Sequence, residues 1–187
     1  MLVIIILLIA NIVTYMKYKE MKQTETNTYE SLVNRIYGYG IQSYDEVYLI
    51  NERLKNNSLD QDGFEGKMQG IITDLTIATE ASAIAANHWN LTIESNAVDS
   101  VSEISGFFRY LSMNLKDILN TEKDFRVWKQ TCAELEDILK IVKDNISEEQ
   151  LIAADYTEVK TMWKETMELV RKQHSKSRLL SSYFTLY

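Results

Sequence analysis

The residue types that most often carry chemistry are few in this chain of 187 residues, and they stand far apart. The two histidines, His88 and His174, have no histidine or cysteine partner at the spacing of a zinc site. The one cysteine, Cys132, falls on the apolar seam of a predicted helix, which favours a buried hydrophobic residue over a nucleophile. Motifs for phosphate loops, zinc proteases and serine hydrolases do not occur. We therefore expect a protein that is not an enzyme and that holds no cofactor and no metal.

The stretch SLDQDGFEGKMQ resembles a calcium-binding loop at Asp60, Asp62 and Gly63. However, Ser58 and Gln69 stand where such a loop needs its first ligand and its bidentate glutamate. We interpret the two aspartates as residues at the N-terminal end of a helix, where negative charge complements the helix dipole.

The charge of the chain is unevenly distributed. Residues 1–24 carry a local charge of +2, which leaves −9 for the rest of a chain whose net charge is −7. An acidic body repels phosphate, so a nucleic-acid partner is not expected. A basic stretch, Arg171 to Arg178, has two interpretations: a helix C-terminus that complements the dipole, or a contact with anionic lipid or an acidic partner.

The first segment predicts an uncleaved membrane anchor over residues 1–23. Leu2 to Met16 carries no charge, no basic residue precedes it, and no small-residue cleavage site follows it. This apolar run is about 22 Å long as a helix, shorter than the roughly 30 Å hydrocarbon core. Tyr15 and Tyr18 could lie among the lipid headgroups, with the lysines that follow Met16 reaching the surface. These lysines favour a cytoplasmic body.

The rest of the chain reads as helix, because it contains no proline and the whole sequence has only 6 glycines. The first segment continues to about Gly38–Gly40, and further helices are predicted at about 43–54, 62–93, 97–119 and 121–143, and from 147 onward. Asn120 or Thr121 would cap the helix at 121–143. The fold class is all-α: an anchor helix, then an antiparallel bundle of long heptad-patterned helices over residues 24–178, and a C-terminal tail over 179–187.

Heptad spacing defines the predicted core faces. The helix at 62–93 places apolar or small residues on one face at steps of four and three, from Phe64 to Trp89. Gly66 and Gly70 form a GxxxG pattern that we expect to serve close helix packing. Phe108 and Trp128 are predicted to face the core from the next two helices, which we expect to form a hairpin.

Four short stretches carry a resemblance to a known family. They are Tyr15–Lys19, Asn27–Tyr29, Ala78–Asn87 and Glu103–Tyr110, which reads EISGFFRY. Together they resemble the N-terminal region of a spore-germination membrane protein family of endospore formers, over about residues 10–170. The resemblance implies a non-enzymatic, extracytoplasmic body that partners the cortex-lytic cell-wall hydrolase. This location differs from the cytoplasmic one that the lysines favour. This chain ends where the family's PepSY-type repeats would begin.

Two functions from different classes fit these features. The first is a membrane-anchored interaction or stabilising module that docks a protein partner in an exposed apolar groove. The second is a sensory input domain that binds a small ligand between the helices of a dimer. The candidate partner or ligand contacts are Trp89, Phe107, Arg109 and Tyr110. A pocket lined by Trp89, Arg109 and Tyr110 would favour the sensor.

Overall fold

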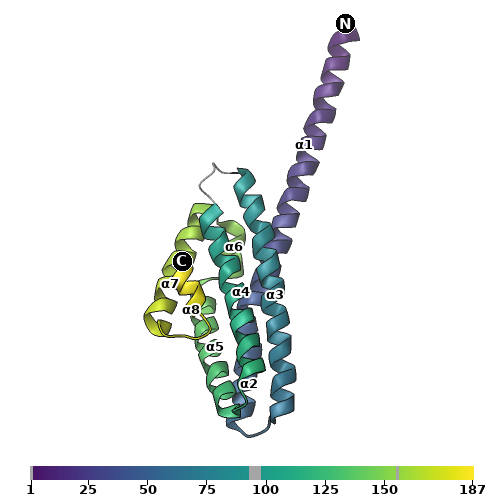
Figure 1. The fold of residues 1–187 in the computed structure, drawn as a ribbon. Helices are drawn as coiled ribbons and strands as arrows, with labels where there is room; N and C mark the ends of the chain where they lie inside the picture. The colour runs from purple at the N-terminus through teal and green to yellow at the C-terminus, as the bar shows by residue number, and fades with distance from the viewer. Residues whose placement is uncertain (1, 93–97, 155) are drawn as a thin grey trace.

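The computed structural model describes residues 2–92, 98–154 and 156–187, and every regular element in these ranges is helical (Figure 1). The all-α fold class is therefore confirmed. The elements are α1 (Leu2–Arg35), the π-helix η1 (Ile36–Ile41), α2 (Ser43–Lys55), α3 (Gln61–Thr92), α4 (Val98–Thr121), α5 (Phe125–Asn145), α6 (Glu148–Ala153), α7 (Tyr156–His174) and α8 (Ser181–Leu186).

The helices form a bundle in which α3 and α4 make the most extensive pairing, while α5 packs mainly on α2 and α7. The helices at 97–119 and 121–143, which were predicted to form a hairpin, correspond to α4 and α5: a short turn joins them, but they contact each other little. The seam of α4 is covered mainly by the preceding helix, α3, whereas the seam of α5 is covered by α2 and α7, which are further away in the chain. Heptad spacing identifies the apolar face of a helix but not the helix that covers it.

The predicted core faces are confirmed wherever the structure describes their side chains. On α3, Phe64, Met68, Leu75 and Ala85 are buried, and on the next two helices Phe108, Trp128 and Cys132 are buried. The GxxxG prediction is wrong, since a β-carbon at Gly66 or Gly70 would find no atom within 4 Å.

The glycines near residue 40 do not end the first helix. Instead the chain passes from α1 into η1, where the Gln42 amide donates to the Tyr37 carbonyl at 2.8 Å, and α2 begins at Ser43. Asp45 of α2 binds Lys143 of α5 at 2.7 Å. The missing side chain at Gly40 lets this segment approach α3 and α4 closely, so here glycine serves packing rather than termination.

The N-terminal part of α1, residues 2–28, projects from the bundle as a purple stalk (Figure 1). Every described side chain from Asn11 to Thr28 is exposed, and contact with the bundle begins at Tyr29, whose hydroxyl donates to the Leu151 carbonyl at 2.8 Å. The membrane anchor predicted over residues 1–23 finds no support here: among the residues described, no helix is both long and apolar enough to cross a bilayer.

Local capping residues fix where the later helices begin. Ser147 and Gln150 form a reciprocal capping box at the start of α6. Asp60 accepts a hydrogen bond from the Gly63 amide at 2.9 Å, which supports its assignment to a helix start. The cap predicted at Asn120 or Thr121 is wrong, because Asp124 caps α5 through the Arg126 amide at 2.8 Å.

The last nine residues pack against the bundle, although the sequence suggested only a tail. Leu179, Leu180 and Tyr183 are buried, and the Asn114 side chain donates to the Leu179 carbonyl at 2.8 Å. Arg178 binds Glu122 at 2.9 Å. The C-terminal segment thus completes the core beside α4 and α7.

Candidate functional site

The four predicted contact residues do not form one surface patch. Phe107 is fully buried, so a partner cannot reach it on the surface of this fold. Arg109 is exposed and Tyr110 is half-buried on the same helix, α4. Trp89 belongs to α3, but its side chain lies outside the part of the chain that the structure describes.

Phe107 belongs instead to an aromatic cluster that joins α4, α7 and α8. Its ring lies 5.3 Å from the rings of Phe108 and Trp163 and 5.8 Å from that of Tyr183, each in an edge-to-face arrangement. The Trp163 indole N–H donates to the Tyr183 hydroxyl at 3.3 Å. This cluster supports the floor of a neighbouring cleft, since Tyr183 belongs to both.

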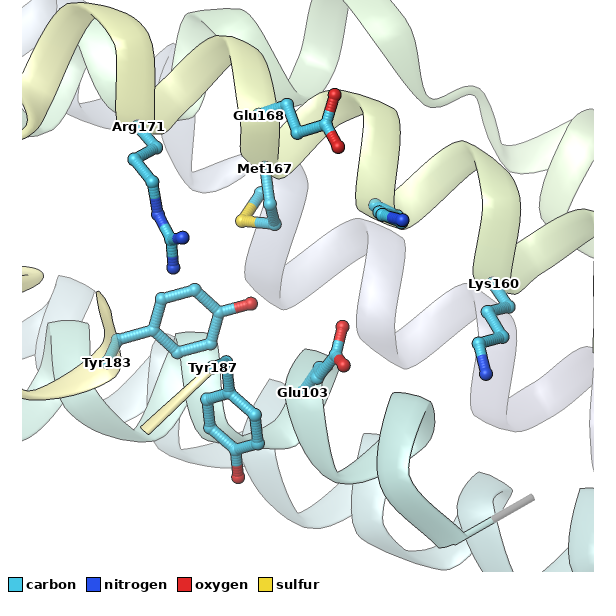
Figure 2. Close-up of a pocket in the computed structure, with 8 residues that line it drawn as sticks. Glu103, Lys160, Met167, Glu168, Arg171, Tyr183 and Tyr187 are labelled. Atoms are coloured by element: carbon cyan, nitrogen blue, oxygen red, sulfur yellow. The ribbon is translucent and has the colours of Figure 1, made fainter. Parts of the chain in front are cut away.

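A cleft of about 160 Å³ opens above this cluster, between α4, α7 and α8 (Figure 2). We call it the α4–α7–α8 cleft. Its lining residues are Glu103 from α4, Lys160, Lys164, Met167, Glu168 and Arg171 from α7, and Tyr183 and Tyr187 from the C-terminal segment. Because the residues of α7 lie four or three apart along one helix face, their side chains reach the same opening.

The cleft contains charges of both signs. Lys160, Lys164 and Arg171 line the cleft from α7. The Glu103 carboxylate lies on the other side of the cleft, on α4 (Figure 2). Burial raises the pKa of the Tyr183 hydroxyl well above its ordinary value, and the Glu103 charge adds to this rise. Tyr183 is therefore a neutral hydroxyl at physiological pH.

Two contacts hold the C-terminal wall of the cleft in place. The Arg171 guanidinium lies over the Phe184 ring, 5.0 Å from its centre, a cation–π arrangement. Tyr187 lies against the backbone at Gly106, where a β-carbon would come within 2.9 Å of the tyrosine ring. A side chain at position 106 would therefore displace Tyr187.

A second, more open groove contains one predicted contact residue, Arg109. It lies between α3 and α4 and is lined by Ile72, Thr76, Thr79, Glu80, Arg109, Ser112, Met113 and Lys116. Six of these eight residues are polar or charged, unlike the continuous apolar groove that a docking module would use.

Neither a metal site nor a family assignment follows from the described residues. Within residues 2–92, 98–154 and 156–187, no three histidine, cysteine, aspartate or glutamate side chains are placed to hold a metal ion. The chain matches no protein-family model, no curated protein and no solved structure.

Sequence reasoning missed the cleft because its residues come from three separate segments. One interpretation of the basic stretch was a contact with anionic lipid or an acidic partner. In the structure Arg171 contacts Phe184 and Arg178 contacts Glu122, so two of its four arginine and lysine residues have partners within the chain. The signal available in the sequence was the cluster of apolar and aromatic residues from Leu179 to Phe184, which is unusual for a free tail.

Proposed function

We propose that this protein is a non-enzymatic, membrane-anchored module: an antiparallel helical bundle that α1 holds at a membrane and that binds a protein partner. The observation that carries this proposal is the stalk. Ile12 is 55% exposed and Met16 is 57% exposed, although they continue an apolar run that begins at Leu2. Exposed apolar side chains on which the bundle does not pack favour an external binding partner, such as a membrane.

The residues after the apolar run suit a membrane surface. Tyr15 and Tyr18 are exposed on the stalk, and Lys17, Lys19 and Lys22 lie near them in the same helix. Tyrosine is favoured among lipid headgroups, and lysine is attracted to anionic lipid. The bundle would then stand beyond the membrane surface.

The chemistry of the protein partner follows from charge. The chain beyond residue 24 has a formal net charge of −9, so a basic surface on the partner would be attracted to it. The spore-germination resemblance adds a specific proposal, a cell-wall hydrolase bound on the extracytoplasmic side.

Flotation with lipid vesicles tests the anchor. The full chain should float with vesicles of phosphatidylcholine and phosphatidylglycerol, whereas a chain that starts at Thr24 should remain unbound. The variant Ile12→Lys/Val13→Lys should lose binding, because it places two charges in the apolar run. Its matched control is Thr24→Lys/Thr26→Lys, which adds the same charges to the polar part of the stalk. Equal flotation of both variants would contradict the proposal.

The α4–α7–α8 cleft favours a second candidate, a sensory input domain. A sensor needs a site where a small molecule contacts more than one structural element. The cleft brings together side chains from α4, α7 and the C-terminal segment, so a ligand there would change how these segments contact each other.

A further inference from the structure

We propose that the α4–α7–α8 cleft binds a small zwitterion, specifically a free α-amino acid with an apolar side chain. This inference rests on the second, sensory function and names its ligand class. It does not depend on membrane attachment.

Charge selects a ligand that carries both signs. Lys160, Lys164 and Arg171 would attract a carboxylate, whereas Glu103 and Glu168 would attract an ammonium group. A simple anion would face two lining carboxylates, and a simple cation would face three lining cations. A molecule with one carboxylate and one ammonium group can satisfy both sets at once.

The floor of the cleft supplies a specific hydrogen-bond donor. Tyr183 is only 2% exposed, and its oxygen accepts the Trp163 indole N–H at 3.3 Å. This bond leaves the tyrosine O–H proton available to an acceptor. Because burial keeps the hydroxyl neutral, it can donate to a ligand carboxylate oxygen.

The arrangement also suggests how the ligand is oriented. Arg171 and the Tyr183 hydroxyl would hold the carboxylate, while Glu103, on the opposite wall, would hold the ammonium group (Figure 2). Met167 and the Tyr187 ring provide apolar surface for a side chain. A volume of about 160 Å³ suits a molecule smaller than a typical drug.

Titration with L-valine and two single-charge analogues tests this inference. Isobutylamine lacks the carboxylate of valine, and 3-methylbutanoate lacks its ammonium group. We expect saturable binding of L-valine to the full chain in mild detergent, measured by calorimetry and by tryptophan fluorescence, because Trp163 contacts Tyr183. Each analogue should bind at least tenfold more weakly. The absence of saturable L-valine binding, or equal binding of either analogue, would overturn the proposal.

A matched pair of variants locates the site. Glu103→Gln should weaken L-valine binding at least tenfold, because it removes the negative charge opposite Arg171. Asp117→Asn, the same type of change at an exposed position of α4 outside the cleft, should leave it unchanged. Equal effects of the two substitutions would overturn the assignment to this cleft. The stalk variants used for flotation leave all cleft residues intact, so the two proposals can fail separately.

Discussion

Gly40 of η1 lies directly against the ring of Phe108 on α4. A β-carbon at position 40 would lie 2.6 Å from the Phe108 Cζ atom and 3.0 Å from the Ala78 Cβ atom. Three elements, η1, α3 and α4, therefore meet at a point that only glycine can occupy without a shift of its neighbours. The segment that connects the first helix to α2 is joined to the core at this contact.

Substitution of this glycine should destabilise the bundle. Gly40→Ala should cost about 1–3 kcal/mol of unfolding free energy, the usual size of an overpacked core substitution. Gly38→Ala is the matched control in the same π-helix, because its β-carbon would find no atom within 4 Å. Urea denaturation followed by circular dichroism measures both, and similar unfolding free energies would contradict the close contact.

Truncation of the buried aromatic residues should cost more. Phe108→Ala and Trp128→Ala should each lower the unfolding free energy by about 3–5 kcal/mol, because both side chains are almost fully buried. They belong to different aromatic contacts, since Phe108 lies beside Phe107 whereas the Trp128 ring stacks on Phe64 at 5.8 Å. Asp137→Ala, an exposed change on α5, should have little effect in the same thermal and urea measurements. If either substitution lowered the unfolding free energy no more than Asp137→Ala does, that result would contradict the core position of the substituted aromatic residue.

Glu136 should be more sensitive than its neighbour Asp137. The side-chain amide of Asn51, which is 4% exposed, donates to the Glu136 carboxylate at 2.6 Å and to the Cys132 carbonyl at 3.1 Å. Glu136→Ala removes one acceptor from a buried donor and should cost about 1 kcal/mol. Unfolding in urea would show this cost, which should disappear in an Asn51→Ala background if the hydrogen bond is its source.

Cys132 should react slowly with thiol reagents in the folded protein. Burial, with a smaller contribution from Glu136, raises the pKa of its thiol to about 12, so little reactive thiolate forms at pH 8. The Ellman reagent should label it only after urea is added. The matched control is Ala133→Cys in a Cys132→Ala background, since position 133 is exposed and should react at once. Rapid labelling of native Cys132 would show that its helix face is not buried.

Asp74 should make the stability of the bundle depend on pH. Partial burial raises the pKa of its carboxyl, and the Glu46 charge on α2 raises it further. The folded state therefore holds the proton more tightly than the unfolded chain does, and stability falls as pH rises between the two pKa values. At pH 7, Asp74→Asn should increase the free energy of unfolding by up to about 0.5 kcal/mol, because solvent screens this partly exposed carboxylate. The melting temperature should rise slightly as a result. This gain in unfolding free energy should vanish at a pH below the ordinary carboxyl pKa. A gain that is constant at all pH values would contradict the assignment of the pH dependence to Asp74.

The periodicity of the sequence predicted which helix faces are buried, because burial repeats along each helix. Phe64, Leu75 and Phe108 were assigned to the core from spacing alone, and the structure buries them. Periodicity contains no information about long-range partners, so the pairing of α2 with α5 could not be predicted. The π-helix was missed for a related reason, because Gly40 reads as a helix end until the contact with Phe108 is known.

The candidate site was harder to predict than the core. Phe107 and Arg109 are close in sequence, yet one is buried and the other exposed, because α4 is covered on one face by α7 and the C-terminal segment. The Tyr183 hydroxyl meets Trp163 across 20 residues of chain. Such a contact depends on the turn after α7, which no spacing rule specifies.

The π-helical turn also determines how the chain would respond to a change in its length. One residue turns an α-helix by about 100°, and a π-helix accommodates more residues in each turn than an α-helix does. Loss of Gly38, at which a β-carbon would touch nothing nearby, could return the chain to the α-helical register. The stalk would then face a new direction, and Leu32 and Val33 of α1, which the core now buries, would turn with it, while the core contacts of α2 stayed the same. A single-residue deletion or insertion at this turn would thus be an evolutionary route to a different orientation of the bundle.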